Sequence, residues 1–142
     1  MKTILKWPGG KEKELPIINK YTPAYTGRFI EPFVGGGAVL LDVLINKNPK
    51  NVVINDINLE LINAYIQVKK NVDLVIEKLS ELQNEYWYMD DTNRKDMYSL
   101  KRDRFNELII NKDGESIEKA VLFIFLNKTC FNGLYRVNKK GL

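Results

Sequence analysis

The residues best placed to do chemistry in this 142-residue chain are three consecutive glycines and the carboxylates near them. Gly35, Gly36 and Gly37 lie between an apolar stretch that predicts a strand and one that predicts a helix. Glycines at such a junction let the backbone turn tightly and approach a ligand without contact from a Cβ atom. Asp56 follows the next predicted strand, about twenty residues on, where an acidic side chain holds ribose hydroxyls. Together these residues predict a nucleoside pocket.

Two alternatives remain open for these residues. A flexible glycine turn, with Asp56 capping the next helix, would explain the pattern without a ligand. The dinucleotide fingerprint G-x-G-x-x-G is only partly matched, because Leu40 stands where its third glycine would be. Glu31 precedes Pro32 at a strand end that we expect to be close-packed, where a carboxylate is costly unless it accepts hydrogen bonds or faces a cation. A positively charged cofactor or the amides of the glycine turn would each satisfy it.

The elements that must position these residues form the first half of a βαβ unit. A short buried strand is predicted over 27–33, an apolar helix over 38–48 and a second strand over 50–58. The stretch "WPGGK" at 7–11 predicts a tight loop, and the spacing of apolar residues after it predicts a short helix over 15–21.

From residue 59 onward the periodicity is helical. Apolar residues at helical spacing predict helices over 59–66, 75–86 and 98–109, and Ser116 caps an apolar run that predicts a buried helix. We interpret 93–105 as a solvated helix face, Trp87 as core and Cys130 as a small buried side chain. The Asn-Gly pair in "FNGLYRVNKKGL" predicts a hairpin-like turn.

Composition limits the chemistry further. The chain has no histidine and one cysteine, which argues against a zinc finger, a histidine-based metal site and a Ser-His-Asp triad, so we expect no metal. The net charge of +4 favours a polyanionic partner. No apolar run approaches the roughly 20 residues that span a bilayer, and no secretory signal is recognisable at the N-terminus, so we expect no membrane contact and a cytoplasmic location.

Four motifs, in order, resemble the DNA adenine-N6 methyltransferases of the Dam type, the D12 class. They are "LKWPGGK" (5–11), "FIEPFVGGGAV" (29–39), "VINDIN" (53–58) and "NKTCFNGLYRVNKKG" (127–141). The resemblance implies an α/β fold, with part of a Rossmann-like cofactor-binding domain over 1–58 and a helical target-recognition domain ending in a β-hairpin over 59–142. It also implies methyl transfer from S-adenosylmethionine to adenine N6 in double-stranded DNA. GATC is the expected target, in restriction-modification or in a solitary role.

The resemblance assigns the cofactor contacts residue by residue. Trp7 and Lys11 would contact S-adenosylmethionine, and Asp56 would bind its ribose hydroxyls. An aromatic face suits a sulfonium and a lysine suits a carboxylate, so the residue types agree with these roles. The remaining lining residues would be Gly9, Gly10, Glu31, Pro32, Phe33, Gly35, Gly36 and Gly37.

The same resemblance places a DNA-reading hairpin near the end of the chain. Phe131 and Leu134 would wedge between bases, Asn132 would bond a base edge or phosphate, and Arg136 would read guanine. Lys139 and Lys140 add positive charge for phosphates. Without the resemblance, "FNGLYR" would be interpreted as an ordinary hairpin turn.

The family's catalytic Asp-Pro-Pro-Tyr, which holds the flipped adenine, does not occur in the chain. We therefore expect an amino-terminal part of a methyltransferase, with no catalytic residue of its own and no activity alone. A truncated remnant that binds S-adenosylmethionine or DNA is one alternative. A piece of a nicotinamide-dependent oxidoreductase is another.

Overall fold

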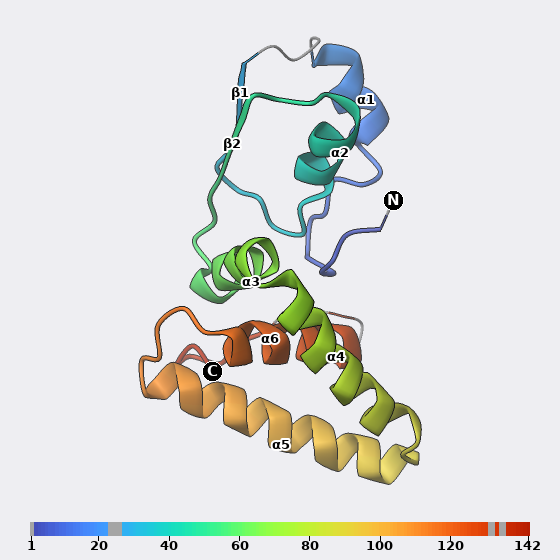
Figure 1. Cartoon of the computed structure of the whole chain (residues 1–142), viewed down its shortest axis with the longest axis vertical. Coiled ribbons are helices and arrows are strands. Elements are labelled where there is room, and N and C mark those ends of the chain that lie inside the picture. The colour runs from blue at the N-terminus through green and yellow to red at the C-terminus, as the bar shows by residue number, and fades with distance from the viewer. Residues whose placement is uncertain (1, 23–26, 131–132, 134–135) are drawn as a thin grey trace. The chain divides into compact units, whose positions relative to one another are not determined.

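The computed structural model describes residues 2–22, 27–130, 133 and 136–142. The chain divides into two compact units, Met1–Ile57 and Asn58–Leu142 (Figure 1). Among the described residues, the first unit contains two strands and two helices, and the second contains four helices. The DNA contacts predicted for Phe131, Asn132 and Leu134 concern residues outside the described ones.

The N-terminal unit is a strand-helix-strand unit preceded by a short helix. In chain order its elements are α1 (Leu15–Tyr21), β1 (Arg28–Glu31), α2 (Ala38–Asn46) and β2 (Asn51–Ile54). The strands are parallel, with Phe29 opposite Val52 and Glu31 opposite Ile54. Each element lies within or close to the range that the sequence predicts, so the expected βαβ start is confirmed.

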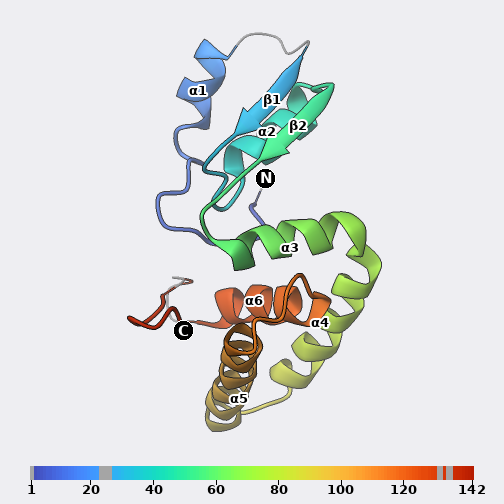
Figure 2. The same cartoon turned by 90° about the vertical axis from the view of Figure 1, so that its left-hand side faces the viewer.

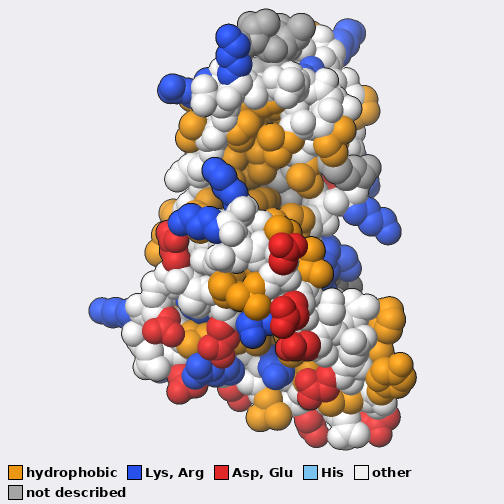
Figure 3. Space-filling model, in the orientation of Figure 1, with side chains coloured by type: hydrophobic (Ala, Val, Ile, Leu, Met, Phe, Trp, Pro, Cys, Tyr) orange, Lys and Arg blue, Asp and Glu red, His pale blue; other side chains and the backbone are white. Residues whose placement is uncertain are grey.

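The helices α1 and α2 lie on the same side of the two strands (Figures 1 and 2). On β1 only Phe29 is buried, whereas Ile30 is 58% exposed. The prediction of a buried strand over 27–33 is therefore wrong for most of its residues. Within the described part of this unit helices cover one face of the sheet, and hydrophobic side chains gather on the surface of the unit in Figure 3.

The second unit contains α3 (Leu59–Lys70), α4 (Val72–Trp87), α5 (Asp91–Ile110) and α6 (Ile117–Thr129). Three of these helices begin at side chains that cap them. The Asn58 side chain accepts from the Leu61 amide at 2.8 Å, Asp90 from the Asn93 amide at 2.9 Å, and Ser116 from the Lys119 amide at 3.1 Å. The predicted caps at Asn58 and Ser116 are confirmed.

Helix α6 forms the centre of this unit and packs against α3, α4 and α5 (Figure 1). Its apolar run from Ala120 to Phe125 is buried throughout, as predicted for a helix that is apolar on all sides. Two polar contacts join α6 to α3. Asn63 donates to the Ser116 carbonyl at 2.9 Å and accepts from its amide at 3.1 Å. The buried Lys119 ammonium lies 3.1 Å from a Glu60 oxygen.

Two core assignments from the sequence are corrected by the structure. Trp87 is 64% exposed, because Tyr86 takes the inward position and packs edge-on against Phe125, with ring centroids 5.7 Å apart. Cys130 is only half-buried. The predicted solvated face over 93–105 holds for most positions, whereas Met97 and Phe105 are buried.

Residues 136–142 form no strand, and the predicted hairpin, which falls partly outside the described residues, stays a prediction. Within this segment the Asn138 amide donates to the Leu142 carbonyl at 2.8 Å, and the Asn138 side chain accepts from the Lys140 amide at 2.8 Å. Across the described ranges, no helix has the length and apolar character needed to cross a bilayer.

Candidate functional site

In the glycine turn of the N-terminal unit, the backbone adopts conformations that are unfavourable for residues with a side chain. Gly35 and Gly37 have φ of 48° and 77°, in the left-handed region where glycine carries no Cβ penalty. The Val34 amide donates to the Asn55 carbonyl at 2.9 Å, so the turn continues directly from the β1–β2 ladder. The Gly37 amide donates to the Val34 carbonyl at 2.9 Å and closes the turn at the start of α2.

The indole of Trp7 packs against this turn. A Cβ on Gly35 would lie 2.9 Å from the Trp7 Cδ1 atom, and a Cβ on Gly36 would lie 3.1 Å from the Leu5 carbonyl oxygen. Real Cβ atoms essentially never approach a neighbour below 3.0 Å. The close approach of Trp7 therefore requires the bare backbone at Gly35, whereas a Cβ at Gly36 would make a tight contact that a small shift of the neighbouring backbone could relieve.

Asp56 is bound to the glycine turn. Its Oδ2 accepts a hydrogen bond from the Gly35 amide at 3.0 Å. Asp56 does not cap the next helix, because the N-cap residue of α3 is Asn58. The carboxylate of Asp56 thus lies at the carboxyl end of β2, beside the turn.

Glu31, at the carboxyl end of β1, is half-buried, and its Oε2 is buried with no hydrogen-bond partner among the described residues. Burial raises the pKa of this carboxyl from 4.5 to about 7, although a hydrogen bond from the Leu40 amide acts in the opposite direction. The sequence analysis considered amides of the glycine turn as donors to Glu31. In the structure the donor is the Leu40 amide, in the first turn of α2. The carboxylate is suited to a donor or a cation that the described residues do not supply.

These groups line one pocket of about 270 Å³ within the N-terminal unit. Lys11 lines the pocket, and its ammonium donates to the Gly9 carbonyl at 2.9 Å. Phe33 lines the pocket while remaining 84% exposed. Of the residues predicted to line it, the structure brings together Trp7, Gly9, Gly10, Lys11, Glu31, Phe33, Gly35, Gly36, Gly37 and Asp56.

Pro32 is the predicted residue that does not line the pocket. Its carbonyl instead accepts from the Asn55 side-chain amide at 3.2 Å, which joins the ends of the two strands. The lining also includes Val34, Ala38 and Val39, which the sequence analysis did not single out. Their position beside the three glycines is the only signal that could have indicated them.

The predicted DNA-binding residues are less completely described. Arg136, Lys139 and Lys140 are exposed on the segment that follows α6. Among the residues that the structure describes, no group of three or more histidine, cysteine, aspartate or glutamate side chains is placed to hold a metal ion.

Comparison with known proteins defines the class. The profile of the D12 class N6 adenine-specific DNA methyltransferases matches residues 7–142, and the chain belongs to this family. It is 47% identical over 147 residues to the type II methyltransferase M.MjaIII of Methanocaldococcus jannaschii, with 99% of the chain and 50% of the relative covered. It is 41% identical over 138 residues to the DNA adenine methylase of Haemophilus influenzae, covering 97% of the chain and 44% of the relative.

A third relative, the DNA N-6-adenine-methyltransferase of Escherichia phage P1, is 36% identical over 140 residues. The alignment covers 99% of the chain and 17% of that relative. The chain spans half the length, or less, of these curated relatives.

Proposed function

We propose that the N-terminal unit binds S-adenosylmethionine and that the helical unit binds double-stranded DNA, in a protein that methylates adenine N6. The observation that carries the proposal is the buried Oε2 of Glu31, which lacks a partner among the described residues and lines the same pocket as Trp7 and Asp56. Membership of an adenine-specific DNA methyltransferase family supports the same reaction.

The residues present fit this cofactor by their chemistry. The glycine turn lines the pocket, and the Trp7 side chain that packs on Gly35 lines the same pocket. A cationic ligand would supply the partner that the Glu31 carboxylate lacks. When bound, S-adenosylmethionine supplies a methyl group on a positively charged sulfur.

Each polar or aromatic residue of the pocket has a distinct role in this proposal. The indole face of Trp7 attracts the sulfonium, and the Lys11 ammonium pairs with the methionyl carboxylate. Asp56 accepts hydrogen bonds from the ribose hydroxyls while it holds the Gly35 amide. Glu31 counters the positive charge of the ligand.

The DNA contacts of the proposal lie at the end of the chain. Arg136 reads a guanine edge, and Lys139 and Lys140 neutralise phosphates. Phe131, Asn132 and Leu134 are proposed to contact bases in the same segment. GATC is the proposed target, and the names of relatives such as the DNA adenine methylase of Haemophilus influenzae support an adenine-containing site.

The 142 residues contain no Asp-Pro-Pro-Tyr, so we propose that they bind cofactor and DNA but do not transfer the methyl group by themselves. Adenine N6 is a poor nucleophile, and its attack depends on groups that accept its hydrogen bonds and position the amine. A non-catalytic protein that binds S-adenosylmethionine or DNA is the second candidate.

Calorimetric titration of the chain with S-adenosylhomocysteine and, separately, with NAD tests the proposal. We expect the first to bind and the second to bind at least about tenfold more weakly, because the third glycine of the dinucleotide fingerprint is replaced by Leu40. Preferential binding of NAD would contradict the methyltransferase assignment. A radiolabelled transfer assay on GATC duplex, expected to give no methylated product, tests the inactivity of the chain alone.

A further inference from the structure

Strand β1 holds the side chain of Glu31 on the inner face of the sheet, toward α2. Glu31 follows Phe29 by two residues, so the two side chains point to the same face, where Phe29 is buried. The Glu31 carbonyl accepts from the Asn55 amide at 2.9 Å, which fixes the backbone at the end of the strand pair. The carboxyl group therefore lines the pocket from a regular element.

The surroundings of this carboxyl group disfavour a negative charge. Val34 and Ala38, which line the pocket with it, are buried. The Leu40 amide donates to the group, whereas Oε2 is buried and has no hydrogen-bond partner among the described residues. Burial raises the pKa of Glu31 to about 7, so near neutral pH the group exists in both protonated and ionised forms.

The two other charged residues that line the pocket each have a contact of their own. The Lys11 ammonium donates to the Gly9 carbonyl at 2.9 Å, and the Asp56 carboxylate accepts from the Gly35 amide at 3.0 Å. Lys6, on the same segment as Lys11, is exposed and does not line the pocket. These contacts leave the buried carboxyl oxygen without a cation beside it.

The elements around β1 supply no ion pair to Glu31 among the described residues. Strand β2 carries no charged residue over 51–54, and Arg28 lies on the opposite face of β1. The charged residue of α2 is Asp42, which accepts from two asparagine side chains at 2.9 Å. The charged residue of α1 is Lys20, which is exposed.

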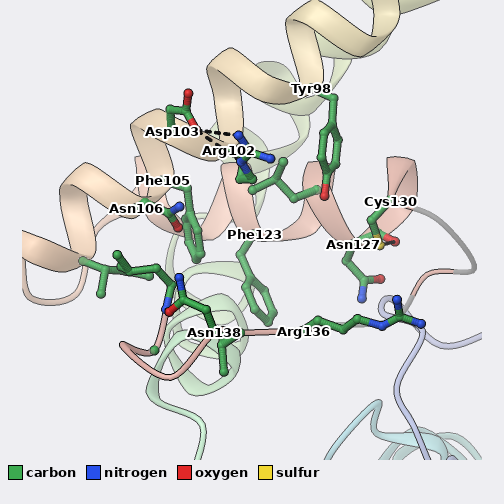
Figure 4. A pocket seen from close by; sticks show the side chains of 15 residues that line it. Tyr98, Arg102, Asp103, Phe105, Asn106, Phe123, Asn127, Cys130, Arg136 and Asn138 are labelled. Atoms are coloured by element: carbon green, nitrogen blue, oxygen red, sulfur yellow. Dashed lines mark hydrogen bonds and ion pairs between the residues drawn. The ribbon is translucent and has the colours of Figure 1, made fainter.

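Two carboxylates of the helical unit show the arrangement that Glu31 lacks. Asp103 lines a cavity of about 510 Å³ and accepts from the Arg102 Nη2 at 2.9 Å (Figure 4). The largely buried Glu60 lies 3.1 Å from the Lys119 ammonium. Because a buried carboxylate is costly without such a partner, the ionised form of Glu31 favours a positively charged ligand.

We propose that Glu31 distinguishes S-adenosylmethionine from S-adenosylhomocysteine by charge, releasing its proton to solvent when the sulfonium binds and keeping it when the neutral thioether binds. The two ligands differ by one methyl group and one positive charge. An ionised Glu31 attracts the sulfonium, whereas a protonated Glu31 leaves no unpaired buried charge beside the thioether. This role rests on the proposed function, and it makes Glu31 the residue that favours the methyl donor over the product.

Proton release gives the two affinities opposite pH dependence. The sulfonium displaces a proton at low pH, so the Kd of S-adenosylmethionine should fall about tenfold between about pH 6 and about pH 8. The thioether binds the protonated form, so the Kd of S-adenosylhomocysteine should rise over the same range.

Calorimetric titration of the chain with each ligand, at about pH 6.5 in buffers of different ionisation enthalpy, counts the protons released. We expect wild type to release more than about half a proton with S-adenosylmethionine and none with S-adenosylhomocysteine. This comparison needs only the wild-type chain, so it holds even if a variant fails to fold.

The matched variants are Glu31→Gln and Glu14→Gln, the second at an exposed position before α1. Glu31→Gln should abolish the proton release and, at about pH 8, lower the ratio of the product Kd to the donor Kd about tenfold. Glu14→Gln should retain both properties. Circular dichroism checks that each variant folds.

Equal proton release with the two ligands would place Glu31 beside a group that they share, such as the α-ammonium, and would overturn this role. A Kd ratio that Glu31→Gln leaves unchanged would overturn it as well. Both results require the ligands to bind, so they leave the proposed function intact. Failure of both ligands to bind would overturn the proposed function and the role of Glu31 together.

Discussion

The Asp56 carboxylate accepts a hydrogen bond from the Gly35 amide at 3.0 Å, which joins the end of β2 to the glycine turn after β1. The acidic group proposed to hold a ribose is therefore also a structural part of the turn. A substitution that keeps an acceptor oxygen, such as Asp56→Asn, tests the role of the charge while leaving this contact possible.

Gly35→Ala is expected to destabilise the N-terminal unit by about 1–3 kcal/mol. The new Cβ would lie 2.9 Å from Trp7 Cδ1, and the backbone φ of 48° disfavours any side chain. Thermal or urea unfolding of the two variants measures the effect against Gly27→Ala, where a Cβ meets nothing within 4 Å. Equal stability of the two variants would show that the Trp7 loop does not pack on the turn.

Glu31 predicts a pH dependence of stability in the ligand-free chain. Its pKa is raised to about 7, so between pH 4.5 and about 7 the folded chain holds a proton that the unfolded chain has released. The contribution of Glu31 to the free energy of unfolding therefore falls as the pH rises through this window. Relative to wild type, Glu31→Gln should gain stability over the same range.

Melting temperatures of wild type and Glu31→Gln at a series of pH values check this prediction. Glu14→Gln, an exposed substitution of the same type, controls for the change of charge. A constant difference between wild type and Glu31→Gln at all pH values would argue against a buried carboxylate at this position.

The Lys119–Glu60 pair predicts strong coupling between α3 and α6. Lys119→Met alone leaves the largely buried Glu60 carboxylate without its partner and should cost about 3–5 kcal/mol, whereas adding Glu60→Leu should restore much of the loss. A double-mutant cycle in urea gives the coupling energy. Additive losses would mean that the two side chains do not interact.

Arg136 and Lys139 predict different effects on DNA binding. Arg136→Ala should reduce discrimination between GATC duplex and other duplexes, because a base contact carries sequence information. Lys139→Ala should weaken binding to all duplexes and flatten its dependence on salt. Titrations at several salt concentrations separate these effects, and an equal loss on every sequence for Arg136→Ala would be evidence against base reading.

Most helices and both strands could be predicted because their signals are local. The glycine turn, the periodicity behind Asn58 and the capped apolar run after Ser116 each fall within one short stretch. It could not be predicted in this way that Tyr86, and not Trp87, packs toward the core. It depends on Phe125, which belongs to another helix.

The sequence predicts which residues line the candidate site, but it does not predict the contacts that these residues make. The sequence placed Glu31 and Asp56 at strand ends, yet two of their properties depend on the fold: the buried Glu31 Oε2 without a described partner, and the bond from Gly35 to Asp56. The Lys119–Glu60 pair lies 59 residues apart in the chain and leaves no local pattern.

The most direct test of the cofactor proposal uses Trp7 as its own reporter. The chain has two tryptophans, so Trp87→Phe, at an exposed position of the helical unit, leaves Trp7 as the sole tryptophan. Titration of this variant with S-adenosylhomocysteine should change the Trp7 fluorescence. Adding Asp56→Asn should raise the Kd at least about tenfold, and adding Glu14→Gln should not. Absence of binding, or binding that leaves Trp7 fluorescence unchanged and is indifferent to Asp56→Asn, would contradict the account.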